Sequence, residues 1–366
     1  MTSINSTKKI IICFGNLGIG GIQTKIVSIS KYLLRTQGDT IRIHLVLRDT
    51  PAFNLEHLIN LPNVIIHHRP KFRLGIIHVP FTLYYPWKII TIRPDVILSF
   101  FDYLSSLSII SSWLLFWKKI RIILNEDILS SAQSRSLFHK FLIHTFYPLA
   151  DRIIVPTRTE KRDLVTHFGI PETKIVVIAN WTQMTKGARV GHKIYDLVFI
   201  GRLEKQKNLL FLLRAMRLLL VWRPGLKLCL VGEGSEKQNL QTYMKHYHLS
   251  RNVTLHNSSH HVSVYIDQSK LFVLSSHFEG MPVALLEVMA RDCPVVAMRY
   301  PGISELLIHG KTGLIADSMN EFVEDIRFLL THPKQRLQMG EAAGIQVRTH
   351  FSRIPLRHYV RVLINN

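Results

Sequence analysis

Residues 271–302 read LFVLSSHFEGMPVALLEVMARDCPVVAMRYPG, and this stretch decides the predicted fold class. The apolar run Leu271–Leu274 has the continuous hydrophobic character of a parallel strand buried on both faces. After a polar loop, Pro282 is expected at the first position of a helix, where its missing N–H is tolerated, and VALLEVMA follows. A second apolar run, Pro294–Met298, predicts the next strand. This order of strand, helix and strand indicates an α/β fold.

Two carboxylates mark the same stretch as a candidate site. Glu279 lies in the loop and Glu287 in the otherwise apolar helix, with seven residues between them. We expect both to face one ligand over the helix start, where the amides near Gly280 and Met281 suit an anion. Ribose hydroxyls would supply hydrogen bonds to Glu287, and the alternative is an ion pair with a core arginine. The stretch predicts a polar ligand at the carboxyl ends of the strands.

The composition is that of a globular chain with an unusual charge. The chain has 366 residues, 47% of them hydrophobic, and a formal net charge of +21. No nucleic-acid-binding module is recognisable, so the basic clusters favour an anionic membrane surface, with a solvated basic surface as the alternative. The three cysteines form no CxxC pair and are predicted to be buried thiols: Cys13, Cys229 and Cys293.

Two segments bear on whether the chain carries a secretory signal or a membrane span. The start MTSINSTKK has no apolar core and is not read as a secretory signal. The segment Val96–Trp117 approaches the length of a membrane span but carries Asp102 and six serines. We therefore predict a strand at Val96–Phe100 followed by a helix at Ser105–Trp117.

The whole chain alternates apolar strand runs with helical periodicity. A glycine-bearing turn and an amphipathic helix follow the strand at 9–14 and lead to the strand at 41–47, which makes a βαβ unit. The pattern restarts after a polar, glycine-bearing segment. We predict two Rossmann-like domains divided as follows: 1–182, the N-terminal domain; 183–193, the linker; 194–350, the C-terminal domain; and 351–366, a last helix.

Two further strand ends in the second half offer groups for a diphosphate. In IGRLEKQKN, residues 200–208, Arg202 leaves a strand and Lys207 precedes a helix, so the two cations suit a pyrophosphate. The alternative is an ordinary basic loop. The VGEGS loop at 231–235 adds glycines at the next strand end. The sequence contains no DxD pair or clustered Cys/His set that would indicate a metal, and no GxSxG or Walker motif.

In combination these motifs resemble the retaining glycosyltransferases of family 4, which have the GT-B fold. FEGMPVALLEVMA resembles the family's E-x7-E motif, IGRLEKQKN its phosphate loop, LVGEG its strand end and PGISELLIHGKTGLI its closing element. LGIGGIQTKIVSISKYLLRTQG resembles the N-terminal glycine loop and its helix. The resemblance covers essentially the whole chain and implies two Rossmann-like domains facing each other, with a C-terminal helix that crosses back to the first domain.

The resemblance also implies roles for single residues. Arg202 and Lys207 would neutralise the donor diphosphate, Glu287 would hold the ribose, and Glu279 would grip the sugar. Asp102 stands near the place of a family histidine, with Asp127 as the alternative, and Gln23 stands where the family often has Glu. The implied catalytic residues are Glu279, Arg202, Lys207 and Asp102. The implied donor-binding residues are Gly20, Gly21, Arg202, Lys207, Glu279, Gly280, Met281, Pro282 and Glu287.

These roles imply a retaining, metal-independent transfer of a sugar from a nucleotide diphosphate, with a UDP- or GDP-sugar expected, to an acceptor hydroxyl. The acceptor is expected to be a sugar or a lipid-linked sugar in cell-envelope polysaccharide, lipopolysaccharide or glycolipid synthesis, and no nucleic acid is expected as a partner. The enzyme is expected in the cytoplasm, on the inner face of the cell membrane. The alternatives are a nucleotide-sugar epimerase on the same fold and a non-catalytic basic membrane-binding protein. The expected membrane-facing residues are Phe72, Arg73, Tyr84, Tyr85, Trp87 and Lys88.

Overall fold

The computed structural model divides the chain into two compact units. Unit 1 comprises Met1–Ala179 and Leu356–Asn366, and unit 2 comprises Asn180–Pro355. The segment expected as a linker, 183–193, falls within the second range and lies partly outside the described residues. The structure describes residues 7–15, 21–48, 61–68, 80–127, 130–131, 137–184, 186–187, 193–257 and 261–365, without the side chain of Asp102.

Unit 1 is built on a seven-stranded parallel sheet with the strand order β3-β2-β1-β4-β5-β6-β7. The strand order reverses between β1 and β4, so this pair forms the topological switch point of the sheet. The strands are β1 (Lys8–Phe14), β2 (Ile41–Leu47), β3 (Val64–His67), β4 (Val96–Phe100), β5 (Arg121–Asn125), β6 (Arg152–Val155) and β7 (Ile175–Val177).

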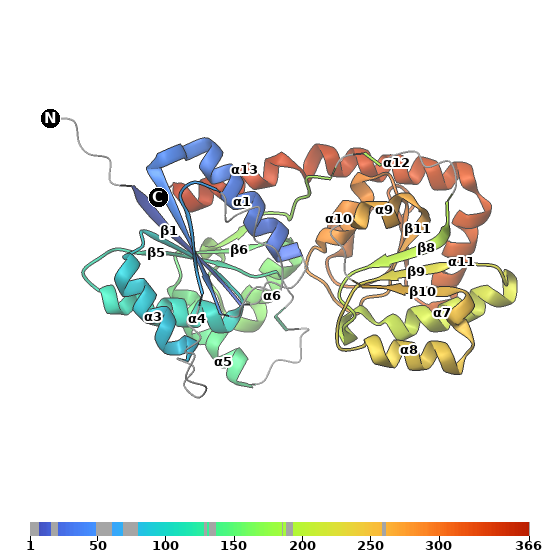
Figure 1. Ribbon diagram of the computed structural model, residues 1–366, viewed down its shortest axis with the longest axis horizontal. Helices are drawn as coiled ribbons and strands as arrows, with labels where there is room; N and C mark the ends of the chain where they lie inside the picture. The colour runs from blue at the N-terminus through green and yellow to red at the C-terminus, as the bar shows by residue number, and fades with distance from the viewer. Residues whose placement is uncertain are drawn as a thin grey trace. The chain divides into compact units, whose positions relative to one another are not determined.

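Helices cover both faces of this sheet (Figure 1). Helix α1 lies on one face, and α3, α4 and α5 lie on the other (Figure 1). Thr157 caps α6 through a complete capping box with Glu160. The helices are α1 (Gly21–Gln37), α3 (Phe81–Ile92), α4 (Asp102–Ser112), α5 (Leu137–Phe146) and α6 (Arg158–Phe168), with a short 3₁₀ helix, η2 (Trp113–Leu115), after α4.

The last helix, α13 (Arg353–Ile364), brings the C-terminus to unit 1. Its Tyr359 is fully buried and donates a 2.8 Å hydrogen bond to Oδ1 of Asn125 at the end of β5. Lys8 Nζ on β1 donates to the carbonyl of Ile364 at 2.9 Å. The crossover predicted for the C-terminal helix is therefore present.

Unit 2 is built on a six-stranded parallel sheet with the order β10-β9-β8-β11-β12-β13. The order reverses between β8 and β11, which are hydrogen-bonded neighbours. The strands are β8 (Tyr195–Ile200), β9 (Leu228–Val231), β10 (Val253–His256), β11 (Ser269–Leu274), β12 (Val295–Met298) and β13 (Leu314–Ala316).

Helices also sandwich the second sheet, with α9, α10 and α12 on one side and α7, α8 and α11 on the other (Figure 1). Phe211 of α7 and Phe322 of α11 meet edge to face, which fixes these two helices together. The helices are α7 (Leu209–Trp222), α8 (Lys237–His246), α9 (Val262–Asp267), α10 (Val283–Ala290), α11 (Met319–Thr331) and α12 (Pro333–His350).

The structure confirms two sequence predictions and corrects a third. The three cysteines are free and buried. Val96–Trp117 forms β4, α4 and η2 instead of one long helix, and none of the helices in the described ranges is both long and apolar enough to cross a bilayer. The expectation that Tyr84 and Tyr85 face a membrane is wrong, because both pack in the core beneath α3. Phe72 and Arg73 lie outside the described residues.

Candidate functional site

The site lies at the switch point of the unit 2 sheet, where two loops leave neighbouring strands. The β8–α7 loop carries Arg202 and Lys207, and the β11–α10 loop carries Glu279. Because β8 and β11 are adjacent and parallel, both loops emerge at the same edge of the sheet. Pro282 occupies the cap position just before α10, one residue earlier than predicted, and its φ of −67° leads directly into the helix.

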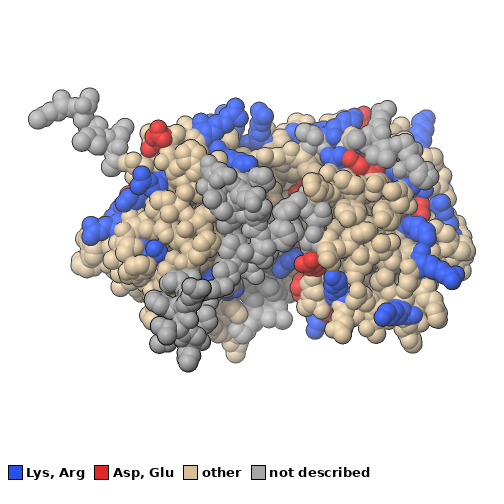
Figure 2. Space-filling model, viewed as in Figure 1, with Lys and Arg blue, Asp and Glu red and all other residues tan. Residues whose placement is uncertain are grey.

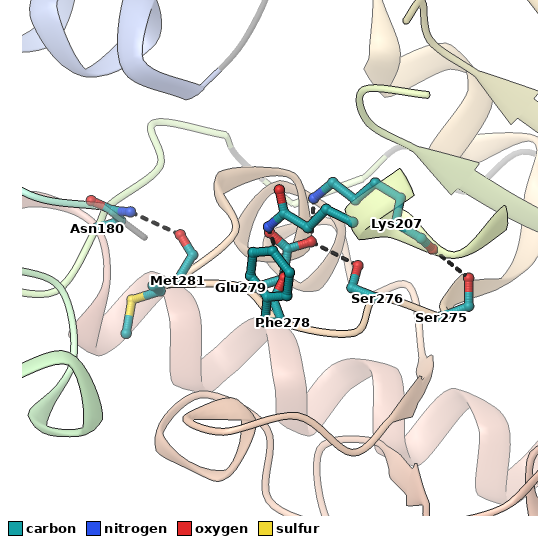
Figure 3. Close-up of polar contacts among 8 residues, drawn as sticks. Asn180, Lys207, Ser275, Ser276, Phe278, Glu279 and Met281 are labelled. Carbon is teal, nitrogen blue, oxygen red and sulfur yellow. Dashed lines mark hydrogen bonds and ion pairs between the residues drawn. The ribbon is translucent and has the colours of Figure 1, made fainter. Parts of the chain in front are cut away.

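Glu279 is the centre of a polar cluster between these loops (Figure 3). The ammonium of Lys207 pairs with Oε1 of Glu279, and both side chains are nearly buried, with 11% and 8% of their surfaces exposed. Ser276 Oγ donates to the same oxygen at 2.7 Å, and Gln206 Nε2 lies 3.3 Å from Oε2. The carboxylate is thus held by a cation and two neutral donors in a partly dehydrated place, where charge-assisted contacts are strong.

Further hydrogen bonds hold the two loops together. Gln206 accepts a 2.9 Å bond from the His277 amide and donates a 2.7 Å bond to the Phe278 carbonyl. Ser275 Oγ donates to the Lys207 carbonyl at 2.8 Å. Motif spacing did not reveal Gln206 or Ser276, because their function is to fix other side chains. The only signal in the sequence is their position within the two loops.

Arg202 differs from Lys207 in being exposed. Among the described residues, its guanidinium makes no hydrogen bond or ion pair. The edge of the sheet therefore presents one cation locked to a carboxylate and one cation open to a ligand. A forked guanidinium in this place can bind two oxygens of an anion.

Glu287 lies one turn into α10, and burial alone raises the pKa of its carboxyl to about 7. Within the part of the chain that the structure describes, no hydrogen bond or ion pair reaches this carboxyl, so the alternative of a core arginine partner is not realised. A carboxyl so placed can accept hydrogen bonds from a ligand that donates them.

The backbone near the start of α10 offers donors as well. Neither the Gly280 nor the Met281 amide donates to another residue in the described ranges, whereas the Met281 carbonyl accepts a 2.8 Å bond from Asn180 Nδ2 (Figure 3). Asn180 therefore fixes this turn, and the two amides remain open to an anion.

The glycines of the β9–α8 loop have a packing function. A Cβ on Gly232 would lie 1.9 Å from the carbonyl oxygen of Gly201, and one on Gly234 would lie 2.4 Å from that of Leu203. The Leu203 amide donates to the Glu233 carbonyl at 2.8 Å. These glycines let the neighbouring loop approach and so support the backbone on which Arg202 stands.

Two of the residues predicted in unit 1, Gly21 and Asp102, follow the carboxyl ends of β1 and β4 in the chain. Gly21 is the first residue of α1, Gly20 lies outside the described residues, and Asp102 begins α4 after β4. Asp127 pairs with Lys25 of α1 at 2.9 Å, and the Lys25 side chain is 4% exposed. Asp127 is therefore engaged with a buried lysine. Phe101, just before Asp102, has a φ of +72°, an uncommon backbone state for such a residue.

The next feature is the set of side chains that could bind a metal ion in the described parts of the chain. These parts contain no group of three or more His, Cys, Asp or Glu side chains arranged to hold a metal ion. Arg202 and Lys207 are two cationic side chains that the site offers to an anion.

Comparisons with known proteins support the same interpretation. Residues 19–186 match the family model of glycosyltransferase family 4, and residues 185–345 match that of glycosyl transferases group 1. One curated relative is the N-acetylgalactosamine-N,N'-diacetylbacillosaminyl-diphospho-undecaprenol 4-alpha-N-acetylgalactosaminyltransferase of Campylobacter jejuni, 29% identical over 61% of this chain. The chain spans 64% of that relative's length.

Solved structures show the same fold over nearly the whole chain. Anabaena Alr3699/HepE, solved in complex with UDP and glucose, superposes with a TM-score of 0.82 at 16% identity and covers 98% of this chain and 100% of its own. TarM superposes with a TM-score of 0.81 at 13% identity and covers 99% of each chain. At these identities the likeness establishes the arrangement of the chain and not its substrate.

Proposed function

Since the chain belongs to the glycosyltransferases of group 1 and family 4, with the GT-B fold, we propose that it transfers a sugar from a nucleotide diphosphate to an acceptor hydroxyl with retention of configuration. The observation that carries this proposal is the grouping of an open arginine, a paired lysine and a half-buried Glu287, which has no polar partner among the described residues, at one switch point. The cations suit a diphosphate, and Glu287 suits the hydroxyls of a ribose.

The proposed chemistry needs charge stabilisation at the leaving diphosphate. Arg202 and Lys207 supply positive charge there without a metal ion, and the Gly280 and Met281 amides add dipoles at the start of α10. Donors aimed at developing charge typically change rates by about two orders of magnitude each. We therefore propose a metal-independent reaction, with the leaving diphosphate assisting removal of the acceptor proton.

The donor and acceptor classes are proposed from relatives. The Anabaena structure contains UDP and glucose, and the name of the Campylobacter enzyme describes an undecaprenol diphosphate-linked acceptor. We propose a UDP- or GDP-sugar as donor and a lipid-linked sugar as acceptor. The enzyme would then act in cell-envelope glycan synthesis, at the cytoplasmic face of the membrane.

The test is a thermal-shift screen of UDP-, GDP- and ADP-sugars, followed by a transfer assay with and without EDTA and determination of the product anomer by NMR. A bound donor at one hundred times its dissociation constant should stabilise the fold by about 2.7 kcal/mol. Failure of every nucleotide sugar to bind would overturn the donor assignment. Loss of activity in EDTA would overturn metal independence, and an inverted anomer would overturn retention.

A further inference from the structure

Unit 1 exposes an apolar surface that the sugar-transfer site does not use. We call it the α3–η2 surface and define it by Leu83, Trp87 and Ile90 of α3 with Trp113, Phe116 and Trp117 at the end of α4. Phe116 is 86% exposed, Leu83 65% and Trp117 62%. Single exposed apolar residues are ordinary, but a group of six that includes three tryptophans indicates an interaction site.

The surface is continuous because its two parts are packed together. Leu115 of η2 is buried in the same core cluster as Tyr85 and Ile89 of α3. Lys118 Nζ donates a 2.6 Å hydrogen bond to the Arg93 carbonyl, which joins the end of α3 to the turn after η2. On α3 the residues of the surface recur at positions 83, 87 and 90, a spacing that places them on one helix face, opposite the core.

Basic side chains border the surface. Lys88 lies over the ring of Trp87, with 4.5 Å between Nζ and the ring centroid, and Lys119 and Arg93 are exposed. The nearby Asp95 pairs with Lys118 at 2.8 Å, so its negative charge is compensated. Figure 2 shows few acidic side chains among the Lys and Arg of the visible face, in keeping with the net charge of +21. This combination of tryptophan, leucine and lysine suits the headgroup layer of an anionic bilayer.

We propose that the α3–η2 surface inserts into the headgroup region of an anionic membrane and holds the enzyme there. This inference rests on the lipid-linked acceptor of the proposed function. Only one face of α3 is apolar and exposed, because the other face is occupied by the core, so α3 lies flat in the interface and does not span it.

This orientation connects the membrane to the acceptor side of unit 1. Helix α4 runs from Asp102, at the carboxyl end of β4, to Trp113 of η2. Its 11 residues span about 16 Å, so the surface lies within a few helical turns of the sheet's switch point.

The experiment is vesicle flotation of the full chain with phosphatidylcholine alone or mixed with phosphatidylglycerol, at low and high salt. We expect binding to the anionic vesicles, weakening with salt, and a blue shift of tryptophan fluorescence on binding. The variant Trp113→Ala/Trp117→Ala should bind at least about tenfold more weakly, and Lys88→Gln/Lys119→Gln should lose most of the salt-sensitive part. The matched control is Leu218→Ala/Val221→Ala on α7, which removes exposed apolar side chains of unit 2 and should bind like the parent.

Three results would overturn the proposal. The first is that the parent does not bind anionic vesicles at low salt, and the second is that the α7 control loses as much vesicle binding as the Trp113→Ala/Trp117→Ala variant. The third is a stable dimer that forms without lipid and that the Trp113→Ala/Trp117→Ala variant abolishes. Donor hydrolysis measured without vesicles separates this inference from the proposed function. Hydrolysis without vesicle binding overturns the surface assignment alone, and vesicle binding without any nucleotide-sugar turnover overturns the proposed function alone. Unchanged thermal unfolding of all three double variants shows that the fold is intact.

Discussion

Lys207 Nζ and Glu279 Oε1 form an ion pair that joins two loops from adjacent strands of one sheet, and both side chains are nearly buried. The ammonium has further N–H groups to donate, so Lys207 can remain paired while it binds a diphosphate oxygen. The pair therefore holds the lysine ammonium at a place that is already partly dehydrated. Glu279 thus holds Lys207 in addition to the sugar contact implied by the family resemblance.

The first prediction separates the structural from the chemical contribution of this pair. Lys207→Met should lower the free energy of unfolding by roughly 3 kcal/mol, because it leaves the Glu279 carboxylate buried without its cation. The double variant Lys207→Met/Glu279→Gln removes both charges and should recover most of that loss. Both variants should turn over donor at least about one hundredfold more slowly than the parent.

Urea unfolding measures the free energy of unfolding, and donor hydrolysis independently measures the turnover of the donor. Recovery of activity together with stability in the double variant would contradict a direct contribution of Lys207 to the diphosphate site. An exposed pair of unit 2, Arg327 and Glu324 at 2.8 Å, is the matched control, since its removal should change stability by less than about 1 kcal/mol.

Local sequence patterns were sufficient for most of unit 2. The helix VALLEVMA was expected at the residues that form α10, and the strand Leu271–Leu274 begins only two residues after the observed start of β11. Continuous apolar runs between polar loops determine such elements, because both faces of a parallel sheet are covered. The alternation did not predict that β8 and β11 are neighbours in the sheet, because these strands are not consecutive in the chain.

What local patterns could not supply is the pairing of side chains across loops. Gln206 and Ser276 have no chemical signature of their own. Gln206 contacts Glu279 from 73 positions away in the chain, whereas Ser276 contacts the same carboxylate from three positions away. The same limit explains the error at Tyr84 and Tyr85. An aromatic and basic segment predicts an interface. Whether a tyrosine of this segment faces the core depends on which face of α3 it lies on, and Pro86 and the run of aromatic residues obscured the helical periodicity that would have shown this.

The second prediction concerns Arg202. Because its guanidinium is exposed and makes no hydrogen bond or ion pair with other described residues, Arg202→Ala should leave the free energy of unfolding within about 0.5 kcal/mol of the parent. Its loss should lower kcat/KM about one hundredfold or more. Arg202→Lys should recover only part of the activity, since a lysine is a point charge without the guanidinium fork.

The control for Arg202 is Lys205→Ala, which removes an exposed cation from the same loop. Steady-state kinetics with the nucleotide sugar selected by the thermal-shift screen distinguishes a specific contact from a general electrostatic effect. Equal losses for Arg202→Ala and Lys205→Ala would show that only the net charge of the loop matters.

The third prediction follows from the raised pKa of Glu287. Its ordinary value is 4.5 and burial raises the pKa to about 7, so between these values the folded protein retains a proton that the unfolded chain releases. The free energy of unfolding should therefore fall as pH rises through this window, by at most about 3 kcal/mol from this group. Glu287→Gln should remove this fall and be more stable than the parent at about pH 8, but not at about pH 5.

Donor binding should show the opposite dependence. Ribose hydroxyls donate to the ionised carboxylate, so the parent's affinity should rise with pH up to about 7, while the Gln variant should bind weakly and without this trend. Calorimetry should use an intact nucleotide sugar, because the terminal phosphate of a free nucleoside diphosphate itself titrates near pH 6. The control is Glu324→Gln on the exposed face of α11, and the same pH trend in parent and Glu287→Gln would refute the assignment.

The last prediction tests whether the β9–α8 loop supports Arg202 through its backbone. Gly232→Ala would place a methyl group 1.9 Å from the carbonyl oxygen of Gly201, a contact that only a backbone shift can relieve, and Gly201 directly precedes Arg202. We expect a loss of about 1–3 kcal/mol in the free energy of unfolding, because the added methyl group forces a strained shift of the backbone. Donor affinity should fall with it. Gly225→Ala is the control, since a Cβ there meets nothing within 4 Å. Urea unfolding and donor thermal shifts measured on both variants decide the point: unaltered donor binding in Gly232→Ala would mean that the arginine is positioned by the β8–α7 loop alone.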